Sequence, residues 1–172
     1  MSIQNNKVQE EEKPATAEPV KVMLADDDKD DQEVFHDALK ETDVPAELTT
    51  VNNGQELIDK LKDPSEPNPD IIFLDINMPV KNGLKCLEEI KTDDTLKDIP
   101  TVILSTSDNT KDVERTFSAG ANLYVPKPFS FRNMVLLLKK IFMLKWTGDL
   151  FKPLRKSFLM SEKNLPGNNL KS

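Results

Sequence analysis

The chain has one cysteine and no long apolar run, and these two shortages exclude several classes of protein. Cys86 alone cannot form an internal disulfide framework or a cysteine-rich zinc site. The longest apolar runs lie within residues 135–144 and are separated by Lys139 and Lys140, so neither is long enough to cross a membrane. The start of the sequence also lacks the basic and apolar regions of a secretory signal. We therefore expect a protein of the reducing cytoplasm with no membrane partner.

The sequence also contains fewer basic than acidic residues. The 23 basic residues are outnumbered by 30 acidic ones, which gives a net charge of -7 at pH 7. This balance argues against sequence-independent binding to nucleic acid. The chain contains no G-x-G-x-x-G loop, no P-loop and no G-x-S-x-G motif. Nothing in it therefore indicates nucleotide binding or serine-hydrolase chemistry.

Composition divides the 172 residues into three parts. Residues 1–19 are rich in Gln, Asn, Glu, Pro and Ala. We expect them to be disordered, because they cannot bury enough apolar surface to offset the entropy of ordering. Residues 20–147 carry the patterns of one domain, and residues 148–172 form a basic tail. The apolar residues of that tail leave two interpretations open. The tail is either flexible, or an amphipathic extension that packs on the domain or binds an acidic partner.

Short apolar runs alternate with helical patterns along the domain. The runs, which we interpret as strands, are 20–25, 48–51, 71–74, 102–104 and 123–125. Apolar residues three or four apart predict helices over 30–42, after Gly54, across 84–90, across 113–120 and over 131–147, with Gly148 as the last stop. Strands this apolar, separated by helices, predict a parallel sheet that is covered by helices on both faces.

Reactive side chains follow the predicted strands. In chain order they are Asp26, Asp27, Asp28, Asp75, Asn77, Ser105, Thr106 and Lys127. The carboxyl ends of parallel strands meet at one edge, where ligands collect in such sheets. Crowded carboxylates require a cation, and oxygen ligands suit Mg²⁺ better than zinc or copper. A carboxylate beside such an ion can accept a phosphoryl group, whose oxygens an ammonium and a hydroxyl then stabilise.

Four segments around these residues resemble the receiver domain of bacterial two-component response regulators, in its single-domain, chemotaxis-regulator-like form. They are V-M-L-A-D-D-D (22–28), P-D-I-I-F-L-D-I-N-M-P (69–79), I-P-T-V-I-L-S-T-S (99–107) and A-G-A-N-L-Y-V-P-K-P-F (119–129). The resemblance spans roughly residues 21–147. It implies a flavodoxin-like, doubly wound (βα)5 sandwich with a five-stranded parallel sheet of order 2-1-3-4-5. It also implies a signalling switch in a phosphorelay, not a turnover enzyme.

The resemblance assigns a role to each residue. Asp75 would accept the phosphoryl group from a histidine kinase or phosphotransfer protein, in a self-catalysed step, and would lose it again by self-catalysed hydrolysis. Ser105 and Lys127 would contact the phosphoryl group, the Lys127–Pro128 bond would be cis, and Tyr124 would be the aromatic that switches with Ser105. The ligands implied for Mg²⁺ or Mn²⁺ are Asp26, Asp27, Asp75 and the backbone carbonyl of Asn77.

Other interpretations stand beside this one. Asp28 or Asp30 is expected to cap the helix that follows, and Cys86 to pack in the core. One rival function is a phosphatase of the haloacid-dehalogenase type, which also forms an aspartyl-phosphate. Such enzymes usually carry D-x-D at the nucleophile, whereas residues 75–77 here are D-I-N. A second rival is an unphosphorylated adaptor that uses the same fold.

Only 25 residues follow Thr147, too few for a DNA-binding or catalytic output domain, so we expect output through the surface of the domain itself. The last helix offers a candidate surface. Its expected core stripe is Phe131, Met134, Val135, Leu138, Ile141, Phe142 and Trp146. The apolar residues expected on its two flanks are Leu136, Leu137, Met143 and Leu144. Exposed apolar patches often mark contacts, so this helix is predicted to bind a downstream partner or to form a homodimer.

Overall fold

The computed structural model describes residues 18–144 and 155–161, in which five parallel strands alternate with helices. The strands are β1 (Val20–Ala25), β2 (Ala46–Val51), β3 (Ile71–Leu74), β4 (Thr101–Ser105) and β5 (Leu123–Pro126). The helices are α1 (Lys29–Lys40), α2 (Gly54–Leu61), α3 (Gly83–Thr92), α4 (Thr110–Ser118), α5 (Phe131–Met143) and the short α6 (Arg155–Phe158). The sheet order β2-β1-β3-β4-β5 confirms the predicted topology.

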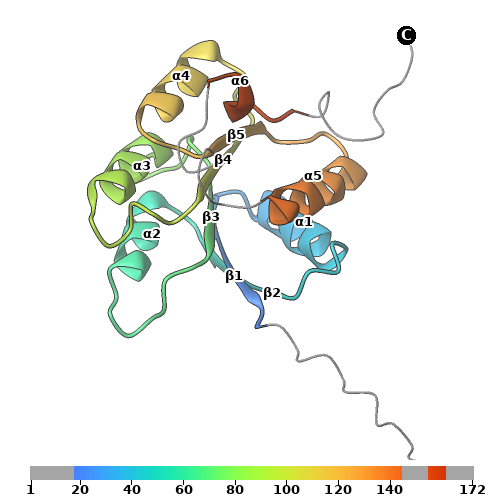
Figure 1. The fold of residues 1–172 in the computed structure, drawn as a ribbon, viewed down its shortest axis with the longest axis horizontal. Coiled ribbons are helices and arrows are strands. Elements are labelled where there is room, and N and C mark those ends of the chain that lie inside the picture. Colours follow the sequence, from blue (N-terminus) through green and yellow to red (C-terminus); the bar gives the residue numbers. More distant parts are fainter. Residues whose placement is uncertain (1–17, 145–154, 162–172) are drawn as a thin grey trace, which may run out of the picture.

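The sheet separates two apolar cores. Helices α1 and α5 cover one face, and α2, α3 and α4 cover the other (Figure 1). The central strand β3 contributes to both cores, because successive side chains of a strand point to opposite faces. Ile72 and Leu74 join the core under α2, α3 and α4, whereas Ile71 and Phe73 join the core under α1 and α5. A strand buried on both faces in this way gives the continuous apolar run that the sequence shows.

Each of the first five helices begins at a side-chain cap. Asp28 caps α1 and accepts hydrogen bonds from the backbone N–H groups of Asp30 and Asp31, which confirms the predicted cap. The other capping residues are Asn53, Asn82, Asn109 and Ser130. These caps fix where each helix starts after a strand. They thereby shape the loops at the carboxyl edge of the sheet.

The prediction for α5 is wrong in three respects. The helix ends at Met143, and Leu137 is 1% exposed, so Leu137 belongs to the core and not to a partner surface. The physical reason is that α5 packs against both the sheet and α1, which widens its buried face. Conversely, Phe131 was placed in the core stripe but is 46% exposed. The predicted homodimer thus loses one of its supporting residues and stays a prediction.

Several sequence-based expectations lie outside the described residues. Of the disorder expected for residues 1–19, the part over 1–17 lies outside them. So do the helical residues predicted over 145–147 with Trp146, the stop at Gly148, and the tail segments before residue 155 and after residue 161. Within 18–144 and 155–161, no helix combines the length and the apolar character needed to span a bilayer.

Cys86 is fully buried in the core beneath α2 and α3, as predicted. Its packing requires a glycine opposite, because a Cβ atom at Gly54 would lie 2.3 Å from Cys86 Sγ. Burial raises the pKa of the Cys86 thiol to about 11.

We expect Cys86 to resist thiol reagents at pH 8 in the native protein. Burial blocks access, and the raised pKa keeps the thiol protonated, whereas the thiolate is the reactive form. A colorimetric disulfide reagent should label the single thiol slowly in buffer and rapidly in guanidinium chloride. Equal labelling rates in the two conditions would contradict the packing described above.

Candidate functional site at the carboxyl edge of the sheet

Three carboxylates meet where β1 and β3 end. Asp26, Asp27 and Asp75 each offer an oxygen, and these three oxygens lie within 4.8 Å of one another. The backbone places them, because the N–H of Asp26 donates to Val51 O at 3.1 Å and the N–H of Asp75 donates to Ala25 O at 3.0 Å. Asp26 and Asp75 are buried, and Asp27 is exposed to solvent. The sheet itself therefore gathers acids that are far apart in sequence.

The Lys127 side chain enters this cluster from the end of β5. Its Nζ atom lies 2.7 Å from Asp26, 3.1 Å from Asp75 and 2.6 Å from Asp31. Its backbone N–H donates to Ser105 O at 2.8 Å, which extends the pairing of β4 and β5. The Lys127–Pro128 bond is trans, so the expected cis bond is wrong. Trans is the commoner isomer of an X–Pro bond, and with it Lys127 already reaches all three carboxylates.

Burial and charge oppose each other at Lys127 and Asp26. Burial by itself lowers the pKa of Lys127, but the hydrogen bonds to Asp26 and Asp31 and the charge of Asp75 outweigh it, so the pKa is raised. Burial raises the pKa of Asp26, and the hydrogen bond with Lys127 only partly opposes this effect. Lys127 is therefore held as an ammonium among more carboxylates than it can neutralise, and the cluster retains an excess of negative charge.

Sequence reasoning missed two residues that complete the cluster. Asp31 comes from the first turn of α1 and supplies the shortest contact to Lys127. Gln32, which is buried, donates from Nε2 to the backbone carbonyl of Asp26 at 2.6 Å. In the sequence, these two residues are marked only by their position about one helical turn after the acidic residues that end β1. That position did not distinguish them from the solvated acids of the same helix.

Ser105 is the last residue of β4, and Tyr124 lies within β5. Both side chains are fully buried. The Oγ atom of Ser105 accepts from the N–H of Ser107 at 3.3 Å, and the hydroxyl of Tyr124 donates to Ser107 O at 2.7 Å. The loop after β4 is thus tied to the predicted phosphoryl contact on one side and to the predicted switch aromatic on the other.

The loop after β3 brings Asn77 and Gly83 against Asp75. Asn77 is exposed, and its N–H donates to Asp75 Oδ1 at 3.2 Å. The Gly83 N–H donates to Ile76 O at 2.9 Å, and a Cβ atom there would lie 2.1 Å from the carbonyl oxygen of Asp75. Only glycine allows α3 to begin this close to the backbone of the central acid.

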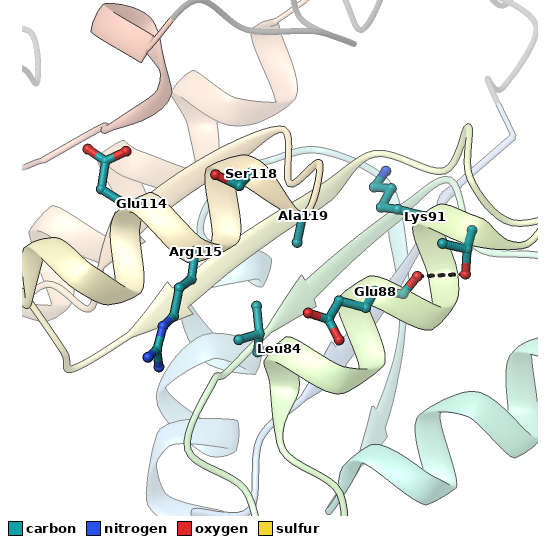
Figure 2. Close-up of a pocket in the computed structure, with 8 residues that line it drawn as sticks. Leu84, Glu88, Lys91, Glu114, Arg115, Ser118 and Ala119 are labelled. Atoms are coloured by element: carbon teal, nitrogen blue, oxygen red, sulfur yellow. Dashed lines mark hydrogen bonds between the residues drawn. The ribbon is translucent and has the colours of Figure 1, made fainter.

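A groove of about 660 Å³ lies between α3 and α4, and none of the predicted site residues line it. Figure 2 shows Leu84 from α3 and Arg115 from α4 on its wall. These two residues also border a neighbouring hollow that is lined by Asp27 and Asn77. Of the three carboxylates of the cluster, Asp27 lines that second hollow.

Comparison with known proteins fits this geometry. A family model described as the response regulator receiver domain matches residues 22–139. The chain belongs to this receiver family. Response regulator Rcp1 of Synechocystis is 32% identical to this receiver over 127 residues, which cover 72% of this chain and 86% of Rcp1. The polar-differentiation response regulator DivK of Brucella anthropi is 29% identical over 121 residues, which cover 70% of this chain and 94% of DivK.

Solved receiver structures share the fold. The phosphorylated cyanobacterial phytochrome response regulator RcpA superposes with a TM-score of 0.67 and 36% identity, over 72% of this chain and 91% of RcpA. The Mn²⁺-bound form of response regulator Rcp1 superposes with a TM-score of 0.69 and 28% identity, over 76% of this chain and 100% of that one. The protein is therefore a two-component signalling receiver with the flavodoxin-like fold.

The loop between Asp75 and Gly83 contains a strained residue. Val80 has a φ of 64° and is 84% exposed. A β-branched side chain disfavours this left-handed conformation, whereas asparagine tolerates it.

We expect Val80→Asn to raise the free energy of unfolding of this receiver by about 1 kcal/mol, because it relieves the strain and gives up little buried surface. Urea unfolding followed by circular dichroism measures the change. Val34→Asn, at a half-exposed helical position of α1, is the matched control and should bring no gain. Equal effects of the two substitutions would show that the left-handed conformation of Val80 carries no cost.

Proposed function

We propose that this receiver accepts a phosphoryl group on Asp75 from the phosphohistidine of a histidine kinase or phosphotransfer protein, and so switches a surface for a downstream protein. One observation carries the proposal: the Asp75 carboxylate lies 3.1 Å from the Lys127 ammonium and in the same cluster as the oxygens of Asp26 and Asp27. A nucleophilic oxygen, a cation and further oxygen donors therefore surround one point at the sheet edge.

The acids fit a divalent cation. Carboxylate and carbonyl oxygens are the donors that Mg²⁺ and Mn²⁺ prefer, and three carboxylate oxygens within 4.8 Å can share one ion. Rcp1, a relative, has been solved in a Mn²⁺-bound form. We therefore assign Asp26, Asp27, Asp75 and the backbone carbonyl of Asn77 as the residues that hold Mg²⁺ or Mn²⁺. When bound, such an ion offsets the charge of the carboxylates and of the phosphoryl oxygens.

In the transfer step, a carboxylate oxygen of Asp75 forms a bond to phosphorus while the N–P bond of the donor breaks. The imidazole nitrogen of the donor leaves with the electron pair of that bond. Lys127 then pairs with the phosphoryl oxygens, and the Ser105 hydroxyl donates a hydrogen bond to them. In the reverse phase, water attacks phosphorus, the P–O bond to Asp75 breaks, and inorganic phosphate and a proton are released. Both phases use residues of the receiver, so it acts as a switch with self-catalysed steps.

The residue at position 77 favours this switch over the phosphatase alternative. An acid two residues after the nucleophile can protonate a leaving group, whereas the Asn77 amide cannot act as a general acid. Its backbone N–H instead supports the Asp75 carboxylate at 3.2 Å. The cytoplasmic location, a histidine kinase or phosphotransfer protein as donor and a downstream protein partner stay predictions.

Acetyl phosphate with Mg²⁺ should add one phosphoryl group to the native chain, and intact-mass spectrometry would measure it. Asp75→Asn should abolish the addition, since an amide oxygen does not replace the nucleophilic carboxylate. Asp30→Asn is the matched control, because Asp30 belongs to the same acidic run but not to the three-carboxylate cluster. A chelator should also prevent the reaction. Persistence of the adduct in Asp75→Asn would show that another residue is the acceptor.

Asp31→Asn should speed phosphorylation by acetyl phosphate about fivefold, equivalent to ~1 kcal/mol. The substitution removes a negative charge that repels the incoming anion and releases Lys127 from one of its three carboxylates. The initial rate of phosphoprotein formation, followed by mass, tests this. Asp30→Asn removes the same charge one residue away and should change the rate less. A slower Asp31→Asn would mean that Asp31 positions Lys127 productively instead of restraining it.

A further inference from the structure

The segment around α6 lies on the outer edge of β5, beside α4 (Figure 1). Strand β5 ends the sheet, and such an edge presents unpaired N–H and C=O groups. Leu159 forms a parallel bridge with Tyr124, and the Met160 N–H donates to Tyr124 O at 2.9 Å. The chain's own residues thus extend the pairing of the sheet at its open side.

Two apolar side chains anchor this segment, one in each core. Phe158 is fully buried on the side of α3 and α4, where its ring centroid lies 5.1 Å from that of Phe117 and 6.3 Å from that of Tyr124. Met160 is buried on the side of α1 and α5. Leu159, between them, is 38% exposed. The segment therefore crosses the sheet edge with one buried side chain on each side of the sheet. Peptides that bind to the edge of a sheet are held in the same way, by backbone pairing and by buried side chains.

The docking position connects to the carboxylate site through Tyr124. The backbone of Tyr124 pairs with the segment, its ring packs on Phe158, and its hydroxyl donates to Ser107 O at 2.7 Å. Ser107 in turn donates from its N–H to the Oγ atom of Ser105. Because closely packed buried side chains cannot move independently, a shift of the Ser105–Ser107 loop must alter the contact between Tyr124 and Phe158.

We propose that Phe117, Tyr124 and the open edge of β5 form a peptide-docking surface whose occupant is residues 155–160 of the same chain, and that phosphorylation of Asp75 weakens this docking. The second part rests on the proposed function. A phosphoryl group that engages the Ser105 hydroxyl changes the loop to which the Tyr124 hydroxyl is bonded, and the packing of Phe158 loosens. By linkage, release of the segment favours the phosphorylated form by the same factor.

Amide exchange of the full-length chain tests the docking surface without phosphorylation. The Met160 N–H should be protected in the native protein and exchange at least about tenfold faster in Phe158→Ala, which removes the buried anchor. Leu159→Ala, at the exposed position between the anchors, is the matched control and should keep the protection. The Ile72 N–H, which donates to Pro100 O in the sheet, reports that the fold persists in each variant. Fast exchange of Met160 in the native protein would overturn the docking.

Beryllofluoride with Mg²⁺, a mimic of the phosphoryl group, tests the coupling. Exchange at Met160 should rise several-fold when the mimic binds, and Asp75→Asn should show no rise. Binding itself is followed by fluorine NMR, so the two proposals fail separately. If the mimic does not bind, the proposed function fails, and docking is judged by Phe158→Ala alone. If the mimic binds and Met160 exchange is unchanged, the coupling is wrong.

Analytical ultracentrifugation, which measures the oligomeric state, distinguishes docking within one chain from an exchange of segments between two chains. A monomer whose Met160 protection is independent of concentration supports docking within one chain. Protection that disappears on dilution, together with a dimer at high concentration, would show that the segment comes from a second copy and would overturn the proposal.

Discussion

One largely buried ammonium joins the parts of the chain on which the site depends. Lys127 follows the last strand and contacts acids from the end of β1, from the start of α1 and from the end of β3. A buried charge that loses its partner is strongly destabilising, so the carboxylates and Lys127 each require the other. The carboxylates exceed what one ammonium can neutralise. That surplus explains why the same residues suit a divalent cation, which would in turn offset the negative charge of an arriving phosphoryl group.

The sheet determines this geometry more than the loops do. Asp26 and Asp75 are the first residues beyond their strands, and their N–H groups continue the hydrogen bonding of the sheet. Their separation therefore follows from strand register, and Gly83 lets α3 begin directly against the Asp75 carbonyl. A site built in this way is rigid before any ligand arrives, which favours transfer chemistry that depends on positioning. The loop after β4, in contrast, is held through Ser107, which donates to Ser105 and Asp112 and accepts from the Tyr124 hydroxyl.

The sequence was sufficient to predict what depends on strand ends and insufficient for what depends on packing. Asp26, Asp27, Asp75 and Lys127 could be placed together because parallel strands share one carboxyl edge. Leu137 was misplaced because helical periodicity allows for one buried face, whereas α5 packs on both the sheet and α1. Asp31 was missed because its contact depends on how α1 is rotated over the sheet. Burial of Phe158 depends on a fit to Phe117 and Tyr124, which local sequence does not encode.

The edge strand β5 connects the charged site to the protein surface, which suits a signalling protein. Lys127, directly after this four-residue strand, belongs to the charged site, while Tyr124 within it pairs with the segment around Leu159. A central strand is paired on both sides, so any change in its pairing would break the sheet. An edge strand can gain or lose a partner on its free side while its pairing with β4 persists. Under the proposed coupling, a change in charge at the carboxyl edge can therefore reach the segment on β5 while the five strands of the sheet stay paired.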